Sequence, residues 1–437
     1  MFLRCLPFLV AVMLCSSFVA HGQNMDFERD RHKTILTMIK DDVKKNYYDP
    51  TFHGKDIDSQ YKGALEKMDK ASSVGQLSGI IAQFLVDFDD SHLFYLPPGK
   101  ANKTDYGFDF RMVGDKCLVI QVNAKSDAAK KGLQVGDELY SIEGFGPSRD
   151  NLWKMRYMFF RLRPMPALRV NVIKPDGKQA QYEVAAKITQ GKRVMDLTGS
   201  DLNQFIRESE DAGAKATRQY YYDKLGGAFI WKMPSFSLEP LKVDEIIDHA
   251  KKFPAIIFDL RGNGGGRVDM VLRLIGDLFP GDVIVADEKR RKEIKEVIAK
   301  SHGKDTYQGK IAVLIDSGSA SASEVFARVM QIEKRGTVFG DQSAGAVMES
   351  RVFGRQLGLD VVIFFGTSVT VADLIMKDGK SLEKIGVTPD VKLLATGKDL
   401  SVKRDVVLSK AAQSLGVELT PEQAGTIFPD DDDNDDE

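Results

Sequence analysis

Cysteine is scarce in this 437-residue chain, which has three. Cys5 and Cys15 lie in an apolar N-terminal segment that we expect to be removed, so the mature chain keeps only Cys117 and no internal disulfide can form. Cys117 lies in the strand-like "KCLVIQV", where we interpret it as a packed apolar residue rather than a nucleophile. The fold must therefore depend on its apolar core.

An excess of one charge is also lacking. The formal net charge is -2 and the sequence has no dense basic stripe, so we expect no nucleic-acid partner. Acidic residues crowd only into "PDDDDNDDE" at 429–437, which we interpret as a disordered tail. Calcium binding there is the less favoured alternative, because disordered carboxylates are poorly preorganised.

The N-terminal apolar segment is short. "MFLRCLPFLVAVMLCSSFVAHGQ" has one basic residue, an apolar stretch and small residues near Gly22, a pattern typical of a signal peptide over residues 1–22. We therefore expect export to a periplasm or beyond. A retained anchor is the alternative, although the stretch falls short of the roughly 20 apolar residues of a membrane helix.

The chain is long enough for two or three domains, and its patterns predict a multidomain α+β protein. Helical periodicity dominates residues 25–102, and short strand-like runs fill 103–190. Apolar strands alternate with helical segments over 195–398, which predicts an α/β domain. Residues 399–437 are expected to hold a C-terminal helix and the acidic tail.

Three alternating serines, Ser319, Ser321 and Ser323, stand between a buried strand and a helix in "VLIDSGSASASEV", residues 313–325. A serine at such a joint lies near free helical amides, which can stabilise the oxyanion of an attacked carbonyl. The same residues, Ser321 to Glu324, also fit a capping box. On this motif alone the capping role is favoured.

A glycine-rich loop follows another apolar strand, in "AIIFDLRGNGGGRVDM" at 255–270. A dinucleotide loop is one interpretation, but Arg267 stands where the third glycine of that fingerprint belongs. The other interpretation is a loop whose glycine amides approach a substrate closely and supply an oxyanion donor.

A serine nucleophile needs a base. Of six histidines, only His92 has a suggestive setting, in "FDDSHLFYLPP" between an apolar helix and an aromatic segment. A solvated loop histidine is the alternative.

The stretch "SDAAKKGLQVGDELYSIEGF" resembles a PDZ domain, with "YGFDF" where that family binds a terminal carboxylate. The resemblance implies that Gly107, Phe108 and Phe110 help to bind an extended peptide as an added strand. A β-domain with a structural role is the alternative.

Three motifs in order, "IIFDLRGNGGG", "VLIDSGSASASEVFA" and "LEKIGVTPDV", resemble the S41 peptidases, which include tail-specific proteases and the tricorn core protease. The resemblance implies a crotonase- or ClpP-like catalytic domain. It also implies Ser321 as nucleophile and the amides of Gly266 and Ala322 as oxyanion donors.

The processing branch of that family uses a lysine base, and Ala346 stands in the lysine's place. The tricorn-like branch instead pairs a Ser-His dipeptide with a downstream glutamate, which matches Ser91, His92 and Glu383. The sequence thus predicts an exported serine endopeptidase that cleaves polypeptides through an acyl-enzyme, without metal or cofactor. The alternative is an inactive peptide-binding protein that keeps the fold.

Overall fold

The structure is a computed structural model that describes residues 6–98, 102–190, 219–358 and 363–428. The predicted acidic tail at 429–437 and the boundary expected at 191–195 lie outside these residues. Within them, no helix is both long and apolar enough to cross a membrane.

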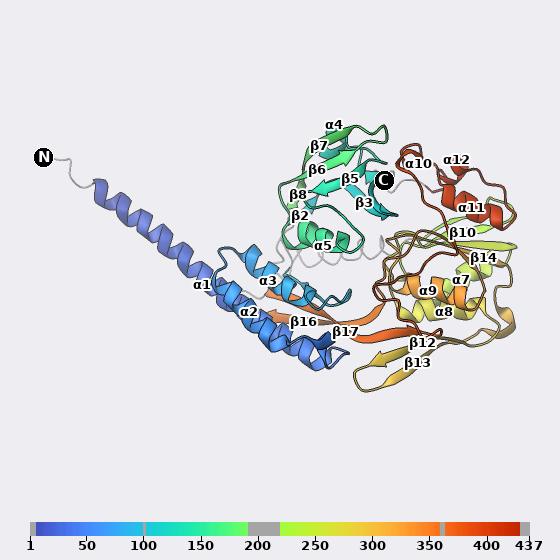
Figure 1. Cartoon of the computed structure of the whole chain (residues 1–437), viewed down its shortest axis with the longest axis horizontal. Coiled ribbons are helices and arrows are strands. Elements are labelled where there is room, and N and C mark those ends of the chain that lie inside the picture. The colour runs from blue at the N-terminus through green and yellow to red at the C-terminus, as the bar shows by residue number, and fades with distance from the viewer. Residues whose placement is uncertain (1–5, 99–101, 191–218, 359–362, 429–437) are drawn as a thin grey trace, which may run out of the picture.

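Three helices form the N-terminal region: α1 (Leu6–Asn46), α2 (Ile57–Asp69) and α3 (Val74–Val86). Ile35, Ile39 and Val43 recur at helical spacing on α1 and are fully buried, as their periodicity predicts. They pack with α2 and α3 in one apolar cluster. The first half of α1 projects away from the rest of the molecule (Figure 1).

Residues 103–190 form a β-domain around a five-stranded antiparallel sheet of order β3-β4-β5-β6-β7. A further pair joins β2 to β8. The elements are β2 (Asn102–Asp105), β3 (Phe108–Val113), β4 (Lys116–Val122), α4 (Asp127–Lys131), β5 (Glu138–Ile142), α5 (Leu152–Arg156), the π-helix Tyr157–Leu162, β6 (Ala167–Ile173), β7 (Gln179–Ala185) and β8 (Lys187–Gln190). The strand β3 is therefore an edge strand.

The α/β domain is built on a six-stranded sheet of order β18-β15-β14-β11-β10-β9, parallel except for β9. Its strands are β9 (Tyr220–Tyr222), β10 (Phe229–Lys232), β11 (Ala255–Asp259), β14 (Lys310–Ile315), β15 (Thr337–Gly340) and β18 (Val391–Lys392). Helices α7 (Pro240–Ala250), α8 (Val268–Leu278) and α9 (Ala322–Ile332) share one apolar core with the sheet. Other residues of the sheet form a second apolar core with α11 (Val406–Ser414) and α12 (Pro421–Ala424), which follow α10 (Gly397–Ser401).

A second sheet links the helical region to the α/β domain. It consists of β1 (Phe94–Leu96), β12 (Val283–Arg290), β13 (Ile294–Ala299), β16 (Met348–Leu357) and β17 (Ile363–Met376). Figure 1 shows β16 and β17 running from beside the N-terminal helices toward β12. One end of β17 pairs with β1, the strand that follows α3, and the other end pairs with β12. This strand therefore connects the helical region to the α/β domain.

Candidate active site

Ser321 is the residue that joins β14 to α9, at the carboxyl end of a central parallel strand. Its backbone has φ 55° and ψ -117°, a conformation that L residues adopt only under local strain. Strained strand-to-helix turns of this kind project a serine away from the sheet. Ser321 is half-buried, and Ser319 and Ser323 on either side are fully buried.

The two flanking serines tie the nucleophile loop to the glycine loop. Ser319 donates its hydroxyl to the carbonyl oxygen of Leu260 at 2.7 Å, and Ser323 donates to that of Asn263 at 2.9 Å. Both hydroxyl protons are therefore used in hydrogen bonds that join the two loops. Of the three serines, Ser321 is the one placed to meet a substrate.

The glycine loop comes close to Ser321. Gly265 has φ +104°, and a Cβ there would lie 2.7 Å from the Cβ of Ser321. Gly266 has φ +151°, and its Cβ would overlap the carbonyl of Phe236. The amides of Gly266 and Ala322, the two predicted oxyanion donors, donate to no acceptor within the described part of the chain.

His92, Ser91 and Glu383 form a hydrogen-bonded relay across 292 residues of sequence. The Ser91 hydroxyl donates to Glu383 Oε2 at 2.8 Å and lies 2.7 Å from His92 Nδ1. Because a hydroxyl has one proton to give, His92 must donate from Nδ1, which leaves Nε2 unprotonated. Glu383 also accepts from the Ser91 and Val347 amides, each at 3.0 Å, as an ionised carboxylate does.

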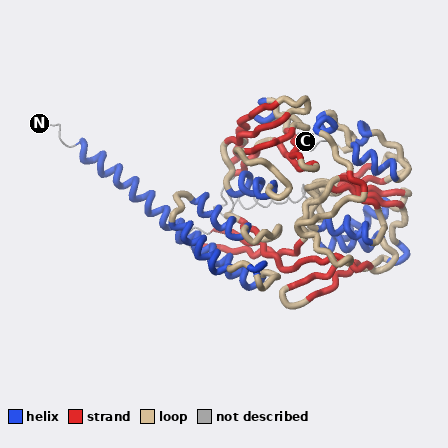
Figure 2. Tube along the Cα trace, viewed as in Figure 1, coloured by secondary structure: helices blue, strands red, loops and turns tan. Residues whose placement is uncertain are grey.

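A single dipeptide connects this relay to Ser321. The carbonyl of Ala346 accepts from the Ser321 amide at 2.9 Å, and the next amide, of Val347, donates to Glu383. The predicted nucleophile Ser321 and the predicted orienting residue Glu383 therefore bind neighbouring residues of the same short segment. Figure 2 shows loops gathered between the β-domain and the α/β domain.

Glu324 fixes this segment from the other side. Its carboxylate accepts from the Ser343 hydroxyl at 2.6 Å and from the amides of Gly345, Ala346 and Ser321 at 2.8 to 3.0 Å. The bond to Ser321 is the one that the capping box predicts. The role of Glu324 at 343–346 was not apparent in the sequence, because no local pattern pairs residues about 20 apart.

Burial dominates the electrostatics of the site. It lowers the pKa of His92 below its ordinary value, an effect that the negative charge of Asp90 opposes. Burial raises the pKa of Glu383, against the hydrogen bonds from Ser91. It also raises the pKa of Glu324 to about 7, although four donors favour its charged form.

The three residues predicted to bind peptide lie in the β-domain, on and next to the edge strand β3. Phe110 is fully buried and Phe108 is 8% exposed, so both side chains belong to the domain core. The amide of Gly107 already donates to Asp105 Oδ1 at 2.8 Å. The side chain of Arg156, on α5, contacts Asp109 and the carbonyl of Phe110.

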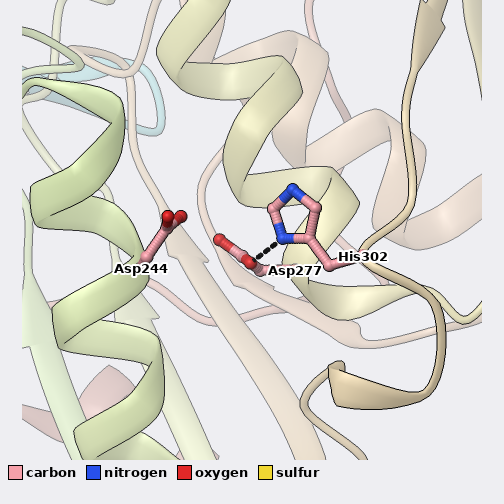
Figure 3. Close-up of side chains that lie close together, drawn as sticks. All are labelled: Asp244, Asp277 and His302. Atoms are coloured by element: carbon pink, nitrogen blue, oxygen red, sulfur yellow. Dashed lines mark hydrogen bonds and ion pairs between the residues drawn. The ribbon is translucent and has the colours of Figure 1, made fainter.

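A cluster at the far end of α8 has the donor types of a metal site. Asp277 lies between Asp244 and His302, with one oxygen toward each (Figure 3). However, Arg273 already holds both oxygens of Asp244, at 2.7 and 2.5 Å, and His302 bonds to Asp277 through Nδ1. A cation would have to displace both partners, so we assign no metal to this cluster.

The chain is similar in sequence to known serine proteases. Residues 230–393 match peptidase family S41, a range that includes Gly266, Ser321 and Glu383 and excludes His92. The tail-specific protease of Haemophilus influenzae is 26% identical over 69% of this chain, and a probable CtpA-like serine protease of Staphylococcus haemolyticus is 24% identical over 78%. The chain covers 43% and 64% of these relatives, less than two thirds of either.

Two solved structures share the fold over most of the chain. Mature CPAF in complex with lactacystin matches with a TM-score of 0.64 and 15% identity, covering 89% of this chain and 97% of that one. The photosystem II D1 C-terminal processing protease matches with a TM-score of 0.52 and 18% identity, covering 90% and 99%. The mixed α/β multidomain architecture is thus that of known S41 proteases.

Proposed function

We propose that this chain, whose residues 230–393 belong to peptidase family S41, is an exported serine endopeptidase that cleaves polypeptides through an acyl-enzyme. The observation that carries the proposal is the relay from Glu383 through Ser91 to His92. In this relay the Nε2 lone pair of His92 is free. Glu383 accepts from the Val347 amide, next to the Ala346 carbonyl that binds the Ser321 amide.

The reaction follows from these positions. His92 Nε2 takes the proton of Ser321 Oγ as that oxygen attacks the scissile carbonyl, and the amides of Gly266 and Ala322 receive the oxyanion. When the intermediate collapses, His92 returns the proton to the leaving amine. Water then attacks the acyl-enzyme with the same base, so every step uses groups of this chain.

The β-domain is the proposed binding surface for an extended polypeptide. PDZ-like domains hold peptides by strand addition, and β3 is the edge strand that would receive one. The carbonyl of Met112 on this strand already accepts from the Ser317 hydroxyl at 2.6 Å. A bound strand must compete with Arg156 for the carbonyl of Phe110. Gly107, Phe108 and Phe110 would then contribute backbone groups rather than side chains.

Export is proposed from the apolar N-terminus, with residues 1–22 as the signal. The structure has one continuous helix from Leu6 to Asn46, so cleavage near Gly22 would remove the first part of α1. The helical core begins further along, at Ile35. Such cleavage therefore leaves that core whole, and the N-terminal residue of the exported protein tests it.

Two variants test the catalytic proposal. Ser321→Ala and His92→Asn should each reduce the hydrolysis of an unfolded protein by several orders of magnitude, because nucleophile and base act as one unit. Circular dichroism should show both variants folded. A fluorophosphonate should label wild type at Ser321, and peptide mapping separates that serine from Ser319 and Ser323.

The Ser323→Ala variant is the matched control, since its hydroxyl binds the Asn263 carbonyl and is buried. It should keep the label at Ser321. Undiminished turnover in Ser321→Ala would refute the assignment. A folded wild type that neither takes the label nor cleaves protein would instead favour the inactive peptide-binding alternative.

A further inference from the structure

Asp90 is a buried carboxylate at the base of the loop that presents His92. Its side chain accepts from the Tyr47 hydroxyl at 2.9 Å, the Thr370 hydroxyl at 2.6 Å and the His92 amide at 2.9 Å. These donors come from the end of α1, from β17 and from the loop itself. The backbone of His92 is thereby fixed to two elements distant in sequence.

The charge of Asp90 is not neutralised. Asp90 is 2% exposed, and among the described residues it forms no ion pair, so neutral donors alone satisfy it. The neighbouring Asp89, by contrast, is mostly exposed and pairs with Lys384 at 2.9 Å. A buried charge without a counterion acts strongly on its surroundings, because the interior screens it poorly.

The protonated imidazole of His92 would be stabilised by a negative charge close to it. Glu383 does not touch the imidazole of His92, because the neutral hydroxyl of Ser91 lies between them. When His92 takes the proton of Ser321, the cation that forms has no carboxylate in direct contact within the described structure. A second negative charge close by would stabilise that cation.

We propose that Asp90 is a positioning residue for the hydrolysis, which anchors the His92 backbone and stabilises the protonated imidazole through its unneutralised charge. The inference rests on the proposed function. The proton moves from Ser321 Oγ to His92 Nε2 and then to the leaving amine, and Asp90 itself neither gains nor loses one.

The ionisable groups around Asp90 and His92 are few. Glu383 faces them from the loop after β17, and Tyr47 and Tyr48 face them from the end of α1, with Asp49 and Asp373 near those tyrosines. Burial raises the pKa of both tyrosines above the ordinary range, so neither ionises at neutral pH. Asp90 and Glu383 are thus the carboxylates that act on His92 directly or through Ser91.

The test separates charge from anchoring. In protein with isotope-labelled histidine, assigned with His92→Gln, the pKa of His92 is measured by NMR in wild type and in Asp90→Asn. Loss of the charge should lower this pKa by about one unit, as expected for a neighbouring opposite charge. The acidic limb of kcat/KM should move to lower pH by the same amount.

Asp89→Asn is the matched control, one residue away, and should shift the His92 pKa by less than half as much because Asp89 is solvated and paired. Thr370→Val removes one anchor and keeps the charge. It should reduce kcat several-fold with KM and the acidic limb unchanged.

Equal shifts in Asp90→Asn and Asp89→Asn, or no shift in folded Asp90→Asn, would overturn the proposal. An unchanged kcat in Thr370→Val would also overturn the proposal. This measurement does not depend on whether Asp90→Asn folds. The NMR measurement does not require turnover. If wild type had no peptidase activity, the proposed function would be wrong. The pKa of His92 in Asp90→Asn would still show whether the charge of Asp90 acts on His92.

Discussion

At the scale of single residues, the site depends on positions where a side chain would not fit. Gly264, Gly265 and Gly266 look equivalent in the sequence, but their surroundings differ. A Cβ on Gly264 would meet nothing within 4 Å, whereas one on Gly265 would lie 2.7 Å from the Cβ of Ser321 and 3.0 Å from the oxygen of Ala320. Glycine is therefore required at 265, the position that approaches Ser321, and not at 264.

We expect Gly265→Ala to reduce kcat by about 100-fold, because a displacement of Ser321 by a fraction of an ångström misaligns its attack. The positive φ adds about 1–2 kcal/mol of backbone strain. Steady-state kinetics and thermal unfolding measure the two effects. Gly264→Ala is the control and should keep near-wild-type kcat; equal losses in both variants would contradict the explanation.

The residues of the predicted site stand in readable motifs, whereas the hydrogen bonds that Asp90 and Glu324 make around them were not predictable. Ser321 and His92 stand in short motifs with a recognisable chemistry. Asp90 and Glu324 had no such signal, because each acts through hydrogen bonds to segments distant in sequence. Glu324 was visible only as half of a local cap, which hid its bonds to Ser343, Gly345 and Ala346.

At the scale of elements, the parallel strands were predictable and the second sheet was less so. Apolar runs such as "AIIFDL" are buried on both faces and became β11 and β14. Much of the charged segment 287–305 forms the hairpin β12–β13, and β12 pairs with the distant strand β17. In β17, the polar residues Thr367, Ser368 and Thr370 are buried, which alternation of apolar residues does not predict.

Glu324 connects the first turn of α9 to the 343–346 segment, and its ionisation makes that connection depend on pH. Its pKa is raised from 4.5 in the unfolded chain to about 7 in the fold. A raised carboxyl pKa means that the folded state binds the proton more tightly. The contribution to stability is therefore full below about pH 4.5 and is lost as the pH rises to about 7.

We expect wild type to lose about 3 kcal/mol relative to Glu324→Gln between pH 4.5 and 7, since each pKa unit corresponds to 1.36 kcal/mol. Urea unfolding of both proteins across this range measures the difference. The informative quantity is how the difference in unfolding free energy between the two proteins changes with pH, because the glutamine amide also loses hydrogen bonds at every pH. Parallel curves would show that Glu324 has an ordinary pKa in the fold.

At the scale of the whole molecule, the β-domain is attached to the catalytic loops at their bases. Arg111, on β3, forms an ion pair with Asp316, the residue after β14. Arg149 contacts Asp341 and donates to the carbonyls of Gly114 and Gln342 at 3.1 and 3.0 Å. Periodicity predicts a β-domain and an α/β domain, but contacts between residues 192 or more apart cannot be read from it.

This attachment predicts that the β-domain affects catalysis even for substrates too short to reach it. Asp341 is 5% exposed at its side chain and lies two residues before the 343–347 segment, which binds Ser321 and Glu383. Removing Arg149 leaves that carboxylate with the amides of Gly114 and Gln342 as its donors. A buried charge that loses its partner costs several kcal/mol or draws in water, and either change loosens the segment.

We therefore expect Arg149→Ala to lower kcat about tenfold on a short ester or peptide substrate, with KM little changed, because the defect lies in the alignment of the catalytic loops. Arg169→Ala is the matched control, since Arg169 lies on the same β-domain in an exposed ion pair 3.7 Å from Glu143. It should leave kcat as in wild type. If Arg149→Ala raised KM only for long polypeptides and spared short substrates, the β-domain would act in substrate binding alone, and its contacts with Asp341 would not organise the catalytic loops.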